Sequence, residues 1–303
     1  MNININFDNK ELLNKIINVL ILLAVFVLLG IIVHKIFNSN VGVEKYHKGM
    51  QLFAQNDYQN AYYNFVRVPK NSKYYYLALF RQGMCAEKLG DNKTQAEKYE
   101  EFVNHSNNSL TAEAAFKSGL AYYFDKSYSD AEKMFKKAAK APIGADEKFS
   151  NYTIAANYYL GELTKEKNPK SALNYYIEYL KNTDVARFSQ KSAVEADKIL
   201  SADNKLSLKE EEYFYLAKAL FLAKDYQKAE KYFDLSQEVQ AWILKAENYT
   251  KLGQKDKALA LLNTGFENYS SELEAKDLTV AINNFANKNP SAIANIPEKK
   301  QKS

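Results

Sequence analysis

The sequence predicts an all-α protein, with an N-terminal transmembrane helix followed by an α-solenoid of about six helix pairs. Three observations support this fold class. The 303 residues include only 10 Gly and 5 Pro, too few for a turn-rich β-sandwich or barrel. A long apolar segment lies near the N-terminus, and a spacing of small and aromatic residues recurs along the rest of the chain.

The apolar segment 16–33 contains one polar residue, Asn18, and apolar character returns at Phe37. Taken as one helix, residues 16–37 would be about 33 Å long, enough to span a hydrocarbon core of about 30 Å. A buried core helix is rarely apolar on every face. A cleaved signal peptide has a shorter apolar region that ends in a small-residue cleavage site, which this segment lacks. We therefore expect a retained membrane anchor at 16–37.

The orientation of this anchor depends on a nearly balanced charge distribution. Lys10 and Lys15 precede the apolar segment, and Lys35, Lys45 and Lys48 follow it. Because the positive-inside rule counts such flanking cations, it does not decide the orientation here. We expect a short cytoplasmic N-terminus and a periplasmic or extracytoplasmic body, which is a common bacterial arrangement for a signal anchor.

The remainder of the chain is organised by an internal repeat. A small residue is followed by Tyr nine positions later, Ala twelve positions later and Phe sixteen positions later. A fourth copy, beginning at Ala246, keeps the spacing to Ala258, and a fifth, beginning at Gly83, reads as one residue longer, with its alanine at Ala96. The three clearest copies are Gly49–Tyr58–Ala61–Phe65, Gly119–Tyr128–Ala131–Phe135 and Ala217–Tyr226–Ala229–Phe233.

Two antiparallel helices that pack closely need a small residue where they face each other, and the large residues fill the space around that contact. A single pair cannot bury its apolar face, so neighbouring pairs stack. This pattern resembles the tetratricopeptide repeat (TPR), a helix–turn–helix unit of 34 residues. The resemblance covers roughly residues 45–267 and implies a superhelix that binds protein or peptide partners.

The repeat is irregular in its middle and changes at its end. The alanines of the second helices lie at 61, 96, 131, 172, 229 and 258, and the long interval before 229 contains an amphipathic segment at 185–200, where we expect an additional helix. Ser271 begins a capping-box sequence that predicts an end helix carrying Leu278, Ile282 and Phe285 on one face. The predicted divisions are a short segment 1–15, the anchor 16–37, a linker 38–44, the solenoid 45–286 and a disordered tail 287–303.

The sequence lacks the signals of catalysis and of nucleic-acid binding. The net charge of +5 is small for this length, and its mixed distribution disfavours nucleic acid as a partner. There is no phosphate-binding glycine loop, G-x-S-x-G or H-E-x-x-H motif, and one cysteine with three histidines leaves little for a metal site. We expect Cys85 to be a core residue, and we expect no enzyme activity, no metal and no small-molecule cofactor.

In the TPR family the first helix of each pair lines a concave groove. The positions three before and four after the small residue should face that groove, and here they are aromatic. The alternative is that these rings fill space between neighbouring repeats. The functional interpretation is an apolar groove for a helix, an extended peptide or a sugar face. The predicted groove residues are Tyr46, Phe53, Phe80, Phe116, Tyr123, Phe214 and Phe221.

Three functional hypotheses follow. The first is a scaffold that is held in a bacterial inner membrane by residues 16–37 and binds proteins through its repeats. The second is a non-catalytic glycan-binding superhelix, because the segment 76–90 resembles the helical part of soluble lytic transglycosylases. The third is an adaptor of the same fold that faces the cytoplasm.

Overall fold

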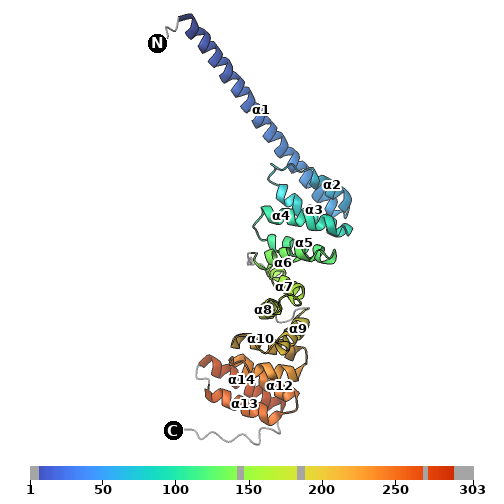
Figure 1. Ribbon diagram of the computed structural model, residues 1–303, viewed down its shortest axis with the longest axis vertical. Helices are drawn as coiled ribbons and strands as arrows, with labels where there is room; N and C mark the ends of the chain where they lie inside the picture. The colour runs from blue at the N-terminus through green and yellow to red at the C-terminus, as the bar shows by residue number, and fades with distance from the viewer. Residues whose placement is uncertain (1–6, 142–146, 183–187, 269–271, 290–303) are drawn as a thin grey trace. The chain divides into compact units, whose positions relative to one another are not determined.

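The computed structural model describes residues 7–141, 147–182, 188–268 and 272–289, and every regular element in these ranges is an α-helix (Figure 1). The chain divides into two compact units, Met1–Pro142 and Ile143–Ser303. The first unit contains α1 (Phe7–Ala54), α2 (Tyr58–Val66), α3 (Tyr75–Leu89), α4 (Asn92–His105), α5 (Thr111–Phe124) and α6 (Tyr128–Ala139). The second contains α7 (Glu147–Thr164), α8 (Pro169–Lys181), α9 (Ser189–Ala202), α10 (Glu210–Leu222), α11 (Tyr226–Phe233), α12 (Val239–Lys251), α13 (Lys255–Asn268) and α14 (Glu272–Lys288).

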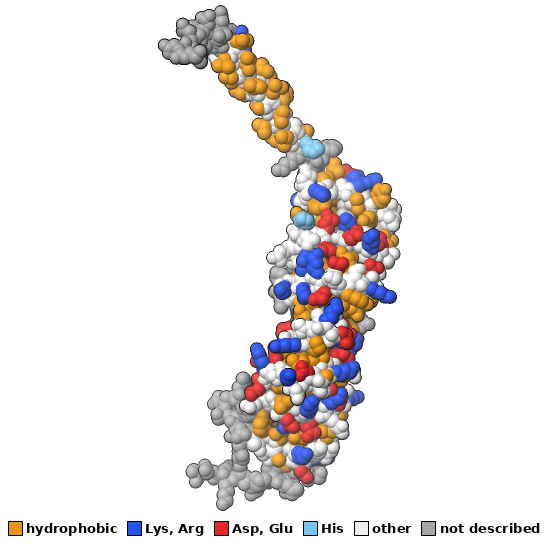
Figure 2. All heavy atoms as spheres, in the orientation of Figure 1, with side chains coloured by type: hydrophobic (Ala, Val, Ile, Leu, Met, Phe, Trp, Pro, Cys, Tyr) orange, Lys and Arg blue, Asp and Glu red, His pale blue; other side chains and the backbone are white. Residues whose placement is uncertain are grey.

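The 48-residue helix α1 combines the apolar segment with the first helix of the first repeat. Its stretch Leu12–His34 is long and apolar enough to cross a membrane, and none of it is buried against the rest of the protein. The large apolar side chains between Leu12 and Val33 are 43–64% exposed, and they cover the visible face of the helix (Figure 2). Residues 38–44, which we expected to form a linker, are helical.

The six predicted helix pairs are present, so the all-α solenoid expected from the repeat is confirmed. They are α1/α2, α3/α4 and α5/α6 in the first unit, and α7/α8, α10/α11 and α12/α13 in the second. Helix α9 is the additional helix expected in the long interval, and α14 is the expected end helix, with Leu278 and Phe285 buried. Ser271 lies outside the described residues, as does most of the tail predicted at 287–303, but its first residues differ from the prediction because α14 extends to Lys288 and Asn289 is buried.

Four of the six pairs are closed by contact between a glycine of the first helix and an aromatic ring of the second. A Cβ atom added at Gly49 would lie 2.6 Å from the Phe65 ring, and one at Gly119 would lie 2.8 Å from the Phe135 ring. These separations are below any ordinary carbon contact, so the close approach of the helices requires glycine there. The same relation holds for Gly83 with Tyr99 and for Gly161 with Tyr176.

The turns between paired helices share one backbone conformation. The residue seven positions after the small residue has a positive φ of 62–79° in five of the six pairs. In the first pair the Asn56 amide donates to the Phe53 carbonyl, and the Asp57 amide donates to the Leu52 carbonyl at 2.9 Å, which together form a Schellman motif. The five positive-φ residues are Asn56, Gly90, Lys126, Lys224 and Gly253.

This turn corrects our reading of the second repeat. Gly90 follows Gly83 by seven residues, as Asn56 follows Gly49, so the turn contains no additional residue. The second helix instead carries the buried Gln95 twelve residues after Gly83, and its amide donates to the Lys117 carbonyl of α5 at 3.3 Å. The sequence comparison had shifted to the adjacent alanine, one position later.

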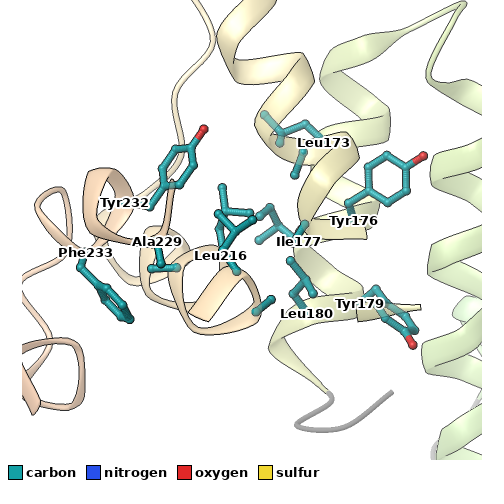
Figure 3. Close-up of a cluster of buried hydrophobic side chains, with 14 of the residues drawn as sticks. Leu173, Tyr176, Ile177, Tyr179, Leu180, Leu216, Ala229, Tyr232 and Phe233 are labelled. Carbon is teal, nitrogen blue, oxygen red and sulfur yellow. The ribbon is translucent and has the colours of Figure 1, made fainter. Parts of the chain in front are cut away.

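The largest hydrophobic cluster lies in the second unit, where α8, α9, α10 and α11 meet (Figure 3). Leu173 and Ile177 of α8 and Leu216 of α10 are at most 2% exposed. Tyr232 and Phe233 of α11 are equally buried on the other side of α10. The additional helix α9 therefore belongs to the core of its unit, where Ala193 and Ala196 are fully buried.

Candidate functional site

The predicted groove residues fall into two classes that differ in burial. The first class contains the residues that lie three positions before the small residue of their repeat. Tyr46, Phe80 and Phe116 are at most 9% exposed. The ring centroids of Tyr46 and Phe65 are 5.7 Å apart. Phe80 contacts Tyr99 in the same way, and Phe116 contacts Phe135. In these three repeats, the first-class ring fills the space between the paired helices.

The second class lies four positions after the small residue and is half-buried. Phe53 meets Tyr58 at a ring-centroid distance of 5.2 Å, and Tyr123 meets Tyr128 at 5.7 Å. The repeated tyrosine thus supports the second-class ring across the turn. Phe221 makes the same contact with Tyr226 at 5.7 Å. These rings keep part of their surface accessible at the end of the first helix.

Two repeats depart from this scheme. Phe214 belongs to the first class by position but is half-buried, and Lys218 lies over its ring at 5.9 Å. In the second repeat Glu87 occupies the second-class position, where it accepts hydrogen bonds from the Tyr99 hydroxyl at 3.2 Å and the Lys117 ammonium at 2.9 Å. The aromatic face is therefore interrupted by a charged contact between α3 and α5.

Sequence reasoning missed an exposed aromatic residue beside the second class. Phe124 follows Tyr123 at the end of α5 and is 65% exposed. With Tyr123 and the 48%-exposed Tyr128, it forms a cluster of three rings, which we call the turn cluster. Leu222 occupies the matching position after Phe221 and is 54% exposed. The available signal was the pair of large apolar residues where α5 and α10 end.

The last repeat holds a pocket of about 120 Å³ between α12, α13 and α14. Ile243 and Thr250, which occupy the two groove positions of this repeat, line it together with Phe285 of the end helix. Its rim carries Glu247 and Lys288. Here the end helix borders the positions that the sequence assigned to the groove.

The described residues do not gather groups suited to metal binding or nucleophilic chemistry. No cluster of three or more His, Cys, Asp or Glu side chains occurs among them. Cys85 is fully buried in α3, as expected for a core residue. Burial raises the pKa of its thiol to about 12, although Arg81 acts in the opposite direction. The thiol is therefore protonated at neutral pH and a poor nucleophile.

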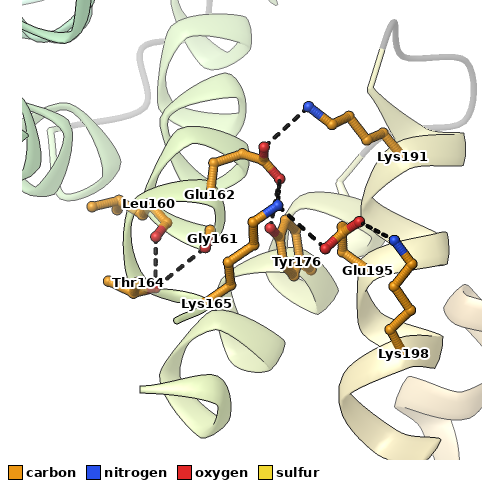
Figure 4. A network of polar contacts seen from close by, with 9 residues as sticks. All are labelled: Leu160, Gly161, Glu162, Thr164, Lys165, Tyr176, Lys191, Glu195 and Lys198. Atoms are coloured by element: carbon orange, nitrogen blue, oxygen red, sulfur yellow. Dashed lines mark hydrogen bonds and ion pairs between the residues drawn. The ribbon is translucent and has the colours of Figure 1, made fainter. Parts of the chain in front are cut away.

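A polar network links α7, α8 and α9 (Figure 4). Glu162 accepts hydrogen bonds from the Tyr176 hydroxyl at 2.7 Å and Lys191 at 3.0 Å, and Lys165 bridges it to Glu195. Burial raises the pKa of Glu162, but these hydrogen bonds and the nearby ammonium groups outweigh that effect and lower the pKa. Every carboxylate in the network has a cationic partner, so its role is to hold the irregular helices together.

Several solved structures have similar helical arrangements. One is Pseudomonas aeruginosa PilF, with 15% identity, a TM-score of 0.35, and coverage of 80% of this chain and 98% of that one. A tetratricopeptide repeat protein from Parabacteroides merdae has 13% identity, a TM-score of 0.41, and coverage of 80% and 99%. The TPR2AB domain of yeast Sti1, in complex with pHSP90, has 13% identity, a TM-score of 0.32, and coverage of 84% and 96%.

No protein-family model matches the sequence, and no curated protein matches it. The assignment of the fold rests on the chain's own repeat: paired antiparallel helices, a small residue facing a large one sixteen positions later, and a recurrent turn. The fold is a tetratricopeptide-type solenoid. Within this TPR-type body, accessible aromatic rings gather at the second-class positions and the turn cluster, and Tyr63 and Tyr76 are exposed elsewhere.

Proposed function

We propose that this chain is a membrane-anchored TPR scaffold that binds protein partners, with its solenoid outside the inner membrane of a bacterial envelope. The observation that carries the proposal is the exposed apolar stretch Leu12–His34, which continues as one helix into the first repeat. A helix that is apolar on every face and buried against nothing in its own chain needs an apolar environment. A bilayer supplies this environment, and the solenoid is then held beside the membrane.

Partner binding in this proposal uses the accessible part of the predicted aromatic groove. Phe53, Tyr123, Phe214 and Phe221 are half-buried and can contact a ligand, whereas the three buried first-class rings support the helices that present them. The preferred ligand is a helix or an extended peptide with apolar side chains, because aromatic rings provide large contact areas with little loss of conformational entropy. Truncating an aromatic anchor of this kind typically costs about 2 kcal/mol of binding free energy.

Topology is tested by cysteine labelling in intact cells. Cys85→Ala removes the native thiol, and Lys88→Cys places a thiol on an exposed residue of α3. Labelling by a membrane-impermeant maleimide, after permeabilising any outer membrane, is the expected result. Protection in intact cells, with labelling restored by lysis, would place the solenoid in the cytoplasm and reject the envelope part of the proposal.

The binding surface is tested by site-specific photocrosslinking. A photoreactive phenylalanine at Tyr123 or Phe221 should give discrete adducts with a partner in cells. The matched control places the photoreactive phenylalanine at Tyr63 instead, a position that is 58% exposed on the second helix of the first pair. Equal adducts at Tyr63 and Tyr123, or none at any position, would contradict binding through the first helices.

A further inference from the structure

The loop between α2 and α3 lies against α1 at a defined height. Gly42 of α1 faces this loop so closely that an added Cβ would clash with Ser72 and would lie 3.5 Å from Pro69. Tyr74, directly after the loop, stacks on Tyr46 with a ring-centroid distance of 4.6 Å. The loop is therefore fixed beside the first turns of α1 that belong to the solenoid.

The height of this loop above a membrane follows from the continuity of α1. Gly42 lies eight residues beyond His34, a rise of about 12 Å in an α-helix. The headgroup region of a bilayer extends about 5–8 Å beyond the hydrocarbon core on each side. Because a lysine side chain reaches roughly 6 Å from the backbone, cations on the loop can meet lipid headgroups.

This part of the solenoid is cationic. The segment 66–74 contains Arg67, Lys70 and Lys73 and no acidic residue, and Glu101 of α4, which lies near Lys70, pairs with Lys98 at 3.1 Å. The adjacent part of α1 adds Lys45 and Lys48, with Glu44 as its one acidic residue between 40 and 48. Lys45 pairs with Glu44 at 2.9 Å, whereas Arg67 and Lys73 lie over the rings of neighbouring tyrosines at 4.9 and 5.1 Å.

The charge differs at the opposite edge of the same repeats. Helix α3 runs alongside α1 in the same direction, since Tyr74 meets Tyr46 and, seven residues later, Arg81 lies over Phe53 at 6.0 Å. The turns at the far ends of these helices therefore lie away from the α2–α3 loop. These turns carry Asp57, Glu87 and Asp91 alongside Lys88 and Lys93, and the corresponding turn after α5 carries Asp125 and Asp130 alongside Lys126.

We propose that Arg67, Lys70 and Lys73 form a cationic collar that binds the headgroups of anionic phospholipids and holds the first repeat against the membrane surface. This inference rests on the proposed membrane anchor. It selects lipid as the occupant because the cations lie next to the apolar helix, where their long side chains can reach the headgroup layer. Each cation near an anionic surface strengthens membrane association by about fivefold, and salt screens this effect.

The test uses the full chain in vesicles of phosphatidylcholine with or without phosphatidylglycerol, each containing a headgroup-linked nitroxide quencher. A fluorophore at Asn71→Cys, in a Cys85→Ala background, reports the distance of the loop from the headgroups. Fluorescence quenching should be about twofold stronger with phosphatidylglycerol, and high salt should remove the difference. The combined variant R67Q/K70Q/K73Q should remove it as well.

The matched control is K88Q/K93Q/K126Q, which removes three cations from the opposite edge and should leave quenching unchanged. Equal quenching in both lipids, or an equal effect of the two triple variants, would overturn the collar, and an acidic protein would then be the better occupant of the cations. Flotation after carbonate extraction tests the anchor separately. A chain that does not float refutes the anchor, whereas one that floats without lipid-dependent quenching refutes the collar alone.

Discussion

The pairs α5/α6 and α7/α8 have the same kind of contact between their helices but are joined by different turns. In both, a glycine of the first helix faces an aromatic ring of the second: Gly119 faces Phe135, and Gly161 faces Tyr176. The first pair uses the positive-φ residue Lys126 and a Schellman motif. The second has four residues between its helices instead of three and contains no positive φ, and it begins α8 with an Asn cap followed by Pro169.

This difference shows which part of the repeat determines the fold. The helix-to-helix contact is kept in both pairs, whereas the turn length changes by one residue. Both pairs are also tied to a neighbouring helix by a carboxylate: Glu162 of α7 accepts from Lys191 of α9, and Glu100 of α4 accepts from Tyr122 of α5 and Lys133 of α6. The close contact between helices is therefore the required feature, and the turn can vary around it.

The largest expected effect comes from filling the glycine contact. Gly161→Ala should destabilise its pair by about 3 kcal/mol and Gly119→Ala by about 2 kcal/mol, because overpacked cores must shift side chains or backbone. Tyr176 is the less able to move, since its hydroxyl also donates to Glu162 at 2.7 Å. Hydrogen exchange of α5–α8 amides in the full chain measures both changes. Adding Phe135→Leu should restore the Gly119 variant; if it does not, the contact is not the cause.

A smaller effect is expected from the Glu162 network of the irregular pair. Glu162→Ala leaves the Tyr176 hydroxyl without its acceptor and should cost about 1–3 kcal/mol. Because the folded pKa of Glu162 is lowered, its contribution is present above the unfolded value of about 4.3 and is lost as the pH falls through the folded pKa. Urea unfolding of the wild type and the variant at neutral and acidic pH checks this prediction. Parallel pH curves would contradict it.

Substitutions in the turns should change stability in opposite directions, depending on whether they introduce or remove glycine at a positive φ. Lys126→Gly and Lys224→Gly should each stabilise the protein by about 0.5–1 kcal/mol, because a residue with a side chain is strained at a positive φ. Gly90→Ala should destabilise by a similar amount. Thermal unfolding followed by circular dichroism measures these shifts, and Lys167→Gly in the turn between α7 and α8, which has no positive φ, is the control. A gain at Lys167 equal to that at Lys126 would show that the turn conformation is not responsible.

The smallest effect on stability is expected at the exposed end of the regular pair. Phe124→Ser should change the free energy of unfolding by less than about 0.5 kcal/mol, because the ring is 65% exposed. Phe116→Ser, in the same helix but 9% exposed, should cost at least about 3 kcal/mol. The comparison uses urea unfolding of both variants. Similar losses would mean that Phe124 belongs to the packed core.

Most of the fold could be predicted because the spacing of small and large residues follows from the contact between paired helices. The spacing from Gly49 to Phe65 located both the helix contact and the turn, and the break in that spacing correctly located α9. The second repeat was misread because an alanine was favoured at the contact position, where the buried Gln95 bonds to the next pair instead. A polar side chain that satisfies a neighbouring backbone has no signature in residue spacing.

The candidate site was less predictable than the fold. Position in the repeat correctly grouped Tyr46 with Phe80 and Phe53 with Tyr123, but it did not distinguish the buried group from the half-buried one. That distinction depends on which partner covers each ring: a residue of the second helix covers the first group, and a turn tyrosine supports the second. Phe124 lies one position further along, where solvent exposure depends on the end of the helix rather than on its periodicity.

Helix α1 runs without a break from the apolar stretch into the first repeat. The number of residues between the two therefore sets how far the repeat is rotated about the helix axis. One residue inserted between 34 and 42 would turn the first repeat by about 100° around the axis of the apolar segment and raise it by about 1.5 Å. Seven inserted residues would nearly restore the phase, at a greater height. The direction in which the first repeat faces is thus set by the number of residues that join it to the apolar stretch.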